Sequence, residues 1–148
     1  MLSNASKYAI RAVLFLAEHS TTASKYAAKD IGEALEIPLP FIAKLLQQLA
    51  KANVISSTKG PNGGFYMTKK NTSQNVCKVL NVIETNDVFV GCFMGLARCG
   101  DENPCPVHHI VVPFKKKLLK KFEKQSIATF SKEISENGSF LSLKGVDF

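Results

Sequence analysis

The feature that most limits how this chain can fold is an amphipathic helix followed at once by a glycine-rich hairpin. The helix, expected at about residues 39–52, carries four aliphatic side chains at helical spacing: Ile42, Leu45, Leu46 and Leu49. Pro38 and Pro40 lie at its start, where proline is tolerated because the first amides of a helix have no partner within it. The opposite face carries lysine and glutamine, so one side should be buried and the other exposed.

The hairpin is predicted from two short strand-like runs, residues 54–57 and 65–68, on either side of a turn. The turn, residues 58–64, contains three glycines, which adopt positive φ without strain and let the backbone approach another molecule closely. Lys59 and Asn62 lie at the tip, where they can contact phosphates or the minor groove of DNA.

Two more helices are predicted upstream. Residues 4–18 place small and aliphatic side chains on one face, with Ser3 or Asn4 as the N-cap, and Ser24 is predicted to cap a helix that ends at Leu35. Two helices joined by a short turn, the second with a polar outer face, form a helix-turn-helix pattern, and a hairpin directly after it makes a winged helix. The alternative is that the polar face is simply solvated.

The net charge of +7 is distributed unevenly. It is +5 over residues 1–72 (nine Lys and Arg against four Asp and Glu), −2 over residues 73–106 and +4 over residues 107–148. A basic first half favours a polyanionic partner, most simply nucleic acid. The alternative is that the charge serves only solubility.

A second constraint is a run of three cysteines and a histidine, Cys92, Cys99, Cys105 and His108, spaced C-x6-C-x5-C-x2-H. The glycines and prolines between them favour a loop that can wrap around one metal centre. Thiolates select iron–sulfur clusters, zinc or copper(I) over hard cations. The spacing is looser than in zinc knuckles and unlike common ferredoxin runs, so the residues alone leave the metal open. The alternative is three unliganded cysteines that happen to be close together.

Downstream of the hairpin, residues 73–84 have helical spacing, and Cys77 within them is predicted to be a small core residue. A long helix is predicted from about residue 107, with an apolar seam suited to a partner helix: Val107, Val111, Phe114, Leu118 and Phe122. Dimerisation is favoured over packing of this seam on its own domain. Pro113 must lie in the first turn or kink the helix. The lysines at 115–117, 120, 121 and 124 are predicted to form its solvated back, and residues 126–135 a further short helix.

Length and composition indicate a DNA-binding domain, residues 1–72, followed by a metal-binding loop and dimerisation helices, residues 73–148. Apolar runs stay well short of 18 residues, and Arg11 interrupts the apolar N-terminal stretch, so neither a membrane span nor a signal peptide is expected. The expected location is the cytoplasm, where a structural disulfide is disfavoured. An enzyme is not expected, because the sequence shows no nucleotide-binding loop, catalytic carboxylate pair or C-x-x-C motif.

The stretch IPLPFIAKLLQQLAKANVISSTKGPNGGFYM resembles the recognition helix and wing of the Rrf2 family of bacterial transcription regulators, which includes IscR, NsrR and CymR. The most specific part is S-x-x-G-P-x-G-G-[FY], residues 57–65 here. The opening SKYAIRAVLFLA matches the family's first helix, and the cysteine loop lies where the family places it.

The resemblance implies a mainly α, homodimeric winged-helix repressor or activator, switched in many members by an iron–sulfur cluster. Its IscR-type ligand set maps onto Cys92, Cys99, Cys105 and His108, with one residue more than usual between the first two cysteines. Lys7 occupies the position at which NsrR-type members have an aspartate ligand, which argues against that mode. A 2Fe–2S cluster is therefore expected ahead of 4Fe–4S, with zinc as the alternative metal.

The expected partner is double-stranded DNA. Its contacts are predicted at the start of the first helix, along the outer face of the recognition helix and at the wing: Lys7, Tyr8, Leu39, Pro40, Phe41, Lys44, Gln47, Gln48, Lys51, Lys59, Asn62, Gly63 and Gly64. Gln47 and Gln48 are expected to read bases, since glutamine can pair bidentately with adenine. The alternatives are a cluster-free regulator controlled by thiol oxidation or by an unidentified protein partner, and a small zinc or thiol redox protein.

Overall fold

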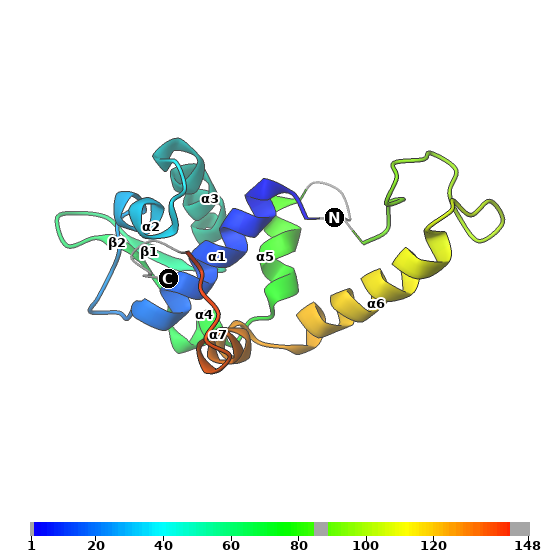
Figure 1. Ribbon diagram of the computed structural model, residues 1–148. Coiled ribbons are helices and arrows are strands. Elements are labelled where there is room, and N and C mark those ends of the chain that lie inside the picture. Colours follow the sequence, from blue (N-terminus) through cyan, green and yellow to red (C-terminus); the bar gives the residue numbers. More distant parts are fainter. Residues whose placement is uncertain (1, 85–88, 143–148) are drawn as a thin grey trace.

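The computed structural model describes residues 2–84 and 89–142 and shows a mainly helical protein with one small antiparallel sheet (Figure 1). Along the chain the elements are α1 (Asn4–His19), α2 (Ala28–Leu35), α3 (Leu39–Lys51), β1 (Ser56–Thr58), β2 (Gly64–Tyr66), α4 (Lys69–Thr72), α5 (Val76–Ile83), α6 (His108–Lys124) and α7 (Ile127–Glu136). The predicted fold class, a winged helix-turn-helix with a two-stranded wing and a long C-terminal helix, is confirmed. Figure 1 shows α6 leading away from the body of the molecule, with the cysteine loop at its far end.

Helices α1 and α3 form where the apolar spacing predicts them. Ser3 caps α1 by accepting a hydrogen bond from the Ser6 amide at 3.1 Å. The predicted inner face of α3 is buried along its whole length: Ile42, Leu45, Leu46 and Leu49. Helix α1 contacts α2, α3, α5 and α7, and its fully buried Ala9 and Ala12 let these helices approach closely.

The second helix begins later than predicted. Ser24 lies in a turn, and α2 begins only at Ala28. The reason is that Tyr26 is recruited by the wing: its amide donates to the Phe65 carbonyl at 3.0 Å, and its own carbonyl accepts from the Phe65 amide at 2.8 Å. Because these bonds need extended backbone, the helix cannot start until the pairing ends.

The wing is the hairpin of β1 and β2, in which Ser57 pairs with Phe65. Val54 and Ile55, predicted to lie in the first strand, precede β1 and are buried in the core. The strands are therefore shorter than predicted, and the wing is joined to the body by these two apolar side chains.

Two glycines of the wing are required by its own geometry. At Gly64 the φ angle is 146°, and a Cβ atom would lie 2.9 Å from the carbonyl oxygen of Tyr26. At Gly63 a Cβ atom would lie 2.3 Å from the carbonyl oxygen of Thr58. A side chain at either position would collide with backbone that cannot easily move.

A short helix that the sequence did not predict, α4, follows the wing. Its Asn71 is buried, and Asn71 Oδ1 accepts hydrogen bonds from Ser56 Oγ at 2.8 Å and from the Thr68 amide at 2.9 Å. Ser73, predicted to begin the next helix, instead ends α4, and α5 begins at Val76. The side chain of Asn71 thus ties β1 to the segment after β2.

Helix α6 covers the predicted segment. Pro113 lies inside the helix, beyond the first turn, which excludes the first of its two predicted placements. Phe122, predicted on the dimer seam, is buried in its own chain, with its ring centroid 6.2 Å from that of Phe89 and 5.7 Å from that of Phe130. The prediction for Phe122 is therefore wrong, because α6 ends against the core rather than outside it.

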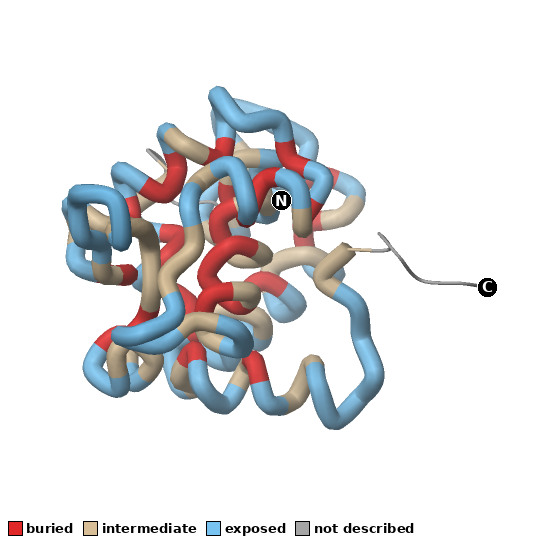
Figure 2. Tube along the Cα trace, turned by 90° about the vertical axis from the view of Figure 1, so that its left-hand side faces the viewer, coloured by how far each residue is buried: buried red, intermediate tan, exposed pale blue. Residues whose placement is uncertain are grey.

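The hydrophobic core contains residues from both predicted domains, 1–72 and 73–148, because α5 and α7 pack against α1. In Figure 2 the buried segments gather at the inside of the molecule and exposed segments surround them. Cys77 is buried within α5, which confirms it as a core residue. No helix within the described residues combines the length and the apolar character needed to cross a bilayer.

Replacing Gly64 by alanine is expected to lower the free energy of unfolding by about 1–3 kcal/mol, because the new methyl group would meet the Tyr26 backbone in a left-handed conformation. Chemical denaturation followed by circular dichroism measures the change. Gly100→Ala is the matched control, since a Cβ atom there meets nothing within 4 Å. Equal midpoints for the two variants would contradict the steric argument.

Candidate metal centre and nucleic-acid interface

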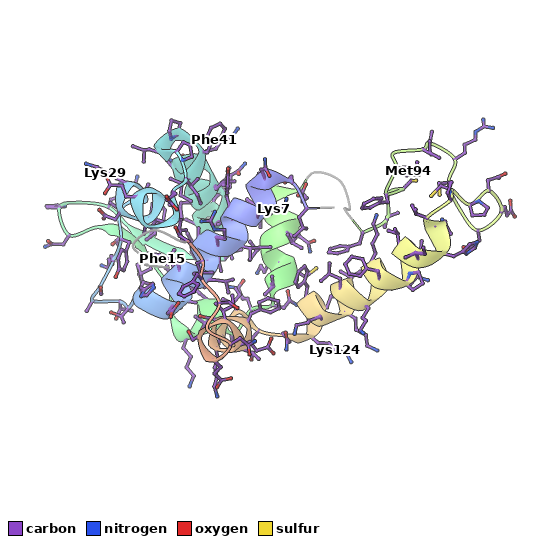
Figure 3. The ribbon with its side chains drawn as sticks, viewed as in Figure 1. Lys7, Phe15, Lys29, Phe41, Met94 and Lys124 are labelled. Atoms are coloured by element: carbon purple, nitrogen blue, oxygen red, sulfur yellow. The ribbon has the colours of Figure 1, made fainter. Side chains whose placement is uncertain are left out.

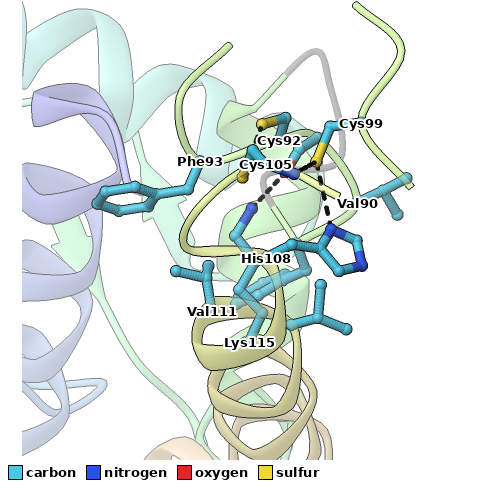
Figure 4. A pocket seen from close by; sticks show the side chains of 11 residues that line it. Val90, Cys92, Phe93, Cys99, Cys105, His108, Val111 and Lys115 are labelled. Atoms are coloured by element: carbon cyan, nitrogen blue, oxygen red, sulfur yellow. Dashed lines mark hydrogen bonds between the residues drawn. The ribbon is translucent and has the colours of Figure 1, made fainter. Parts of the chain in front are cut away.

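The three loop cysteines converge on one point. Their ligand atoms all lie within 4.8 Å of one another, and Figure 4 shows Cys92, Cys99 and Cys105 gathered above the start of α6. Cys92 Sγ lies 3.9 Å from Cys105 Sγ, and the Cys105 amide donates to Cys99 Sγ at 3.4 Å. The chain thus brings together three predicted ligands that are separated by 13 positions between first and last.

The fourth predicted ligand, His108, faces the same group. It begins α6, is 9% exposed, and its Nδ1 lies 3.2 Å from Cys99 Sγ. Its other ring nitrogen, Nε2, lies 3.0 Å from Asp101 Oδ1. The neighbouring His109 is exposed. Of the two adjacent imidazoles, His108 is therefore the one placed to join the cysteines.

A lysine that the sequence assigned to the solvated back of α6 lies beside the cysteines instead. Lys115 is 5% exposed, and its Nζ donates to the Gly91 carbonyl at 2.5 Å. Lys115 follows His108 by about two helical turns and so lies on the same face of α6. It helps to line a cavity of about 40 Å³ together with the cysteines and His108. The prediction for Lys115 is wrong because the loop folds back over this face.

The local environment separates the thiol pKa values. The pKa of Cys92 is lowered to about 7, first by the backbone amide of Leu96 and then, against the effect of burial, by the amide of Met94 and the neighbouring thiols. For Cys99 the amide of Cys105 lowers the pKa, but burial and the contacts with the other two thiols outweigh it and raise the pKa overall. Cys92 is therefore more easily converted than Cys99 to the thiolate that metals bind.

The outer face of α3 and the wing tip form a second candidate site. All the predicted DNA-contact residues are exposed or half-buried, and Phe41 is 62% exposed. Figure 3 shows Phe41 on α3 and Lys7 near the start of α1. A groove of about 450 Å³ lies between α3 and the wing, lined in part by Gln47, Lys51 and Lys59.

A second hollow, of about 430 Å³, lies between α1 and α3. It is lined in part by Tyr8, Phe41, Lys44 and Gln48, so the structure brings the predicted contact on α1 next to those on α3. Leu39 and Pro40 are exposed at the N-terminal end of α3. The glycines of the wing, Gly63 and Gly64, have the structural role described above.

The other residues of the predicted dimer seam on α6 differ in their exposure. Val107, Val111 and Leu118 are half-buried, and Phe114 is 49% exposed. Ile110, which the predicted seam did not include, is the most exposed large apolar side chain of this helix at 73%. The exposed apolar surface thus lies at the end of α6 that carries the cysteine loop.

Sequence reasoning missed Asp101, Lys115 and Tyr26. Asp101 contacts His108, Lys115 contacts Gly91 and Tyr26 pairs with Phe65. Residue spacing and residue type do not predict contacts of this kind, which join separate parts of the chain. The one available signal was for Asp101, an acidic residue inside the cysteine run and seven positions before a histidine.

The chain is similar to a known family of regulators. The sequence model of the Rrf2 family, described as an iron-dependent transcriptional regulator, matches residues 2–133. An HTH-type transcriptional regulator of Aquifex aeolicus is 30% identical over 111 residues, which cover 74% of this chain and 76% of that protein. The regulator IscR of Klebsiella pneumoniae is 30% identical over 107 residues, which cover 72% of this chain and 64% of that protein.

Solved structures show the same architecture. CymR of B. subtilis has a TM-score of 0.69 at 11% identity, and the match covers 90% of this chain and 97% of that one. IscR of T. potens has a TM-score of 0.68 at 19% identity, with 95% and 92% covered. At these identities the likeness establishes the fold.

In reduced, metal-free protein, Cys92 is expected to react with iodoacetamide faster than Cys99 at neutral pH, because the thiolate is the nucleophile. With a pKa of about 7, its rate should rise with pH and level off above that value, while the rate of Cys99 continues to rise. Mass spectrometry of each peptide gives both rates, and buried Cys77 is the slow reference. Indistinguishable pH profiles for Cys92 and Cys99 would contradict the assignment.

Proposed function

The chain belongs to the Rrf2 family of transcriptional regulators, and from this premise we propose that it binds duplex DNA as a homodimer whose affinity depends on an iron–sulfur cluster. The family regulates transcription rather than catalysing a reaction. Binding to DNA follows from that role; the contact residues, the dimer and the cluster belong to the proposal. Since a regulator of this kind acts on the chromosome, the proposal includes a cytoplasmic location.

The DNA contacts are assigned to α3 and the wing. Lys44 and Lys51 supply positive charge to phosphates, and Gln47 and Gln48 supply groups that match base edges in the major groove. Lys59 and Asn62 at the exposed wing tip are assigned to phosphates or the minor groove. The support is that these residues are exposed, that Gln47, Lys51 and Lys59 line the groove between α3 and the wing, and that Lys44 and Gln48 line the hollow between α1 and α3.

The observation that carries the cluster proposal is the convergence of three sulfur atoms and one imidazole nitrogen. Ligands of a tetrahedral first-row metal, with sulfur and nitrogen at their usual bond lengths, lie about 3.8 Å (S to S) and about 3.5 Å (S to N) apart. The corresponding separations here are 3.9 Å for Cys92 and Cys105 and 3.2 Å for Cys99 and His108. Each of these two pairs of donors therefore has about the spacing that two ligands of one metal ion require.

A 2Fe–2S cluster is proposed ahead of 4Fe–4S and zinc. Similarity to two relatives named IscR supports a metal or cluster at this loop, and the choice of 2Fe–2S rests on mixed cysteine and histidine ligation, which is known for such centres. When bound, the cluster would supply a redox-sensitive crosslink among the loop residues. Cys92, Cys99 and Cys105 would hold it as thiolates, and His108 would bind as the neutral imidazole.

The cysteine loop is placed to couple this site to the DNA-binding heads. His108 begins α6, and Phe122 near the other end of α6 packs in the core. A change in how the loop holds His108 would therefore alter the angle of α6 relative to the body. Half-site spacing is a geometric condition for a dimer on DNA, so a small change in this angle changes affinity.

The homodimer is assigned to the loop-proximal half of α6. Phe114 and Ile110 are exposed there, and Phe93, Met94 and Leu96 of the loop are each more than half exposed. Exposed apolar side chains grouped in this way mark an interaction surface. Half-buried Val107 and Val111 adjoin this surface. Leu118, which packs against the core, and Phe122, which its own chain covers, are left out of it.

A cluster-free regulator controlled by thiol oxidation is the second candidate. One observation favours it, the 3.9 Å separation of Cys92 Sγ and Cys105 Sγ with the lowered pKa of Cys92. Protein purified under anaerobic conditions separates the two candidates. A brown sample with matching iron and sulfide supports the cluster, and a colourless sample supports the thiol switch or a zinc site.

Replacing Lys44 or Lys59 by alanine is expected to weaken binding to duplex DNA and to lower the slope of log K against log salt by about 0.9 for each phosphate that is no longer neutralised. Gln48→Ala should cost about 1–3 kcal/mol of discrimination at one base position instead. Fluorescence anisotropy over a salt series, with operators selected in vitro, measures both. Lys132→Ala on α7, an exposed lysine, is the matched control, and equal salt slopes for all three lysine variants would refute this docking surface.

Cys99→Ala and Cys105→Ala are expected to abolish the visible absorption of anaerobically reconstituted protein, because each removes one of four ligands. His108→Ala should lose or shift the absorption, and His109→Ala should leave it unchanged. Cys77→Ala is the control among the cysteines, since Cys77 lies in α5. Loss of the absorption in His109→Ala but not in His108→Ala would assign the histidine ligand to His109. Zinc in the site, without iron or sulfide, would overturn the cluster proposal.

A further inference from the structure

The two ring nitrogens of His108 face different partners. Nδ1 lies 3.2 Å from Cys99 Sγ, on the side of the cysteines, and Nε2 lies 3.0 Å from Asp101 Oδ1. The ring is 9% exposed at the start of α6, so its orientation is set by these two contacts and by the packing around them. Asp101 is exposed and reaches the ring from the loop between Cys99 and Cys105.

The chemistry of the two contacts assigns the hydrogen on the ring. An ionised carboxylate can only accept a hydrogen bond, so Nε2 must carry the hydrogen when it contacts Asp101. A neutral imidazole has one hydrogen, and the lone pair of Nδ1 is then left facing the cysteine sulfurs. A metal ligand needs such a lone pair, and the position of the ring hydrogen therefore decides which nitrogen can bind.

We propose that Asp101 is a positioning residue which holds His108 so that Nδ1, and not Nε2, is its metal-binding atom. This inference rests on the proposed function, in that it assumes a metal centre on the cysteine loop. The arrangement resembles the general carboxylate–histidine–metal pairing, in which the outer carboxylate fixes both the tautomer and the angle of the ring. Asp101 lies between Cys99 and Cys105 on the loop that carries all three thiols, so one segment supplies three ligands and the group that orients the fourth.

The choice of Asp101 over its acidic neighbour can be tested directly. Glu102 is adjacent and also exposed, and it provides a matched control of equal charge. Asp101→Ala removes the acceptor, whereas Asp101→Asn keeps an oxygen that can accept from Nε2–H. A positioning role therefore predicts that Asn retains most of the effect of Asp, whereas a role of negative charge alone predicts that Asn behaves as Ala.

The first experiment uses metal-free, reduced protein. Long-range ¹H–¹⁵N correlation spectra of the histidine rings report which nitrogen carries the hydrogen. The wild type, Glu102→Ala and Asp101→Asn should show His108 predominantly as the Nε2–H tautomer, and Asp101→Ala should show a mixture. A tautomer unchanged by Asp101→Ala, or an Nδ1–H tautomer in the wild type, would overturn the proposal.

The second experiment adds metal. Titration with Co²⁺ should give an affinity about 10-fold lower for Asp101→Ala than for Glu102→Ala. Loss of a group that hydrogen-bonds a metal ligand usually lowers metal affinity by about 10–100-fold, and the smaller effect is expected here because Asp101 is exposed to solvent. In protein reconstituted with iron and sulfide and then reduced with dithionite to the paramagnetic state, histidine labelled with ¹⁵N at Nδ1 should show strong hyperfine coupling, and label at Nε2 should not. Strong coupling from Nε2, or equal Co²⁺ affinities, would count against the assignment.

These measurements distinguish a failure of the cluster proposal from a failure of the role proposed for Asp101. If iron and sulfide are not taken up while the tautomer and the Co²⁺ affinity respond to Asp101→Ala, the cluster proposal fails and the role of Asp101 stands. If the cluster forms normally and neither readout responds, the role of Asp101 fails and the cluster proposal stands.

Discussion

The burial of α1 is the interaction on which the rest of the structure depends. Helices α2, α3, α5 and α7 all contact it, and its fully buried alanines bring them close enough to form one core. The outer face of α3 is presented to solvent because its aliphatic face is taken up by this packing. Removing α1 would therefore remove both the recognition surface and the base from which α6 extends.

A second set of contacts joins the start of α1 to the end of α5. The carboxylate of Glu84 accepts hydrogen bonds from the Ser3 amide at 3.1 Å and from the hydroxyls of Ser3 and Ser6, both at 2.6 Å. Burial alone would raise the pKa of Glu84, but these bonds outweigh it and the pKa is lowered. A negative charge at the N-terminus of a helix is stabilising. The chain thus leaves the winged-helix core from a fixed point before it reaches the cysteine loop.

The cysteine loop is held to α6 by polar contacts rather than by a core of its own. Lys115 bonds the Gly91 carbonyl, and His108 lies between Cys99 and Asp101. Since Val90, Phe93, Met94 and Leu96 of this loop are exposed, a metal centre bound there would add to its stability.

The sequence alone determined the features that depend on local physics. Apolar spacing determined α1 and the buried face of α3, and glycine, with its freedom at positive φ, marked the wing turn. The candidate thiol ligands could be named because three cysteines within a glycine- and proline-containing run can converge on one centre. Tertiary structure decided the rest: the late start of α2, the burial of Lys115 and Phe122, and the contact of Asp101 with His108. Each depends on two segments meeting in space, and residue spacing along one segment carries no information about which other segment will cover it.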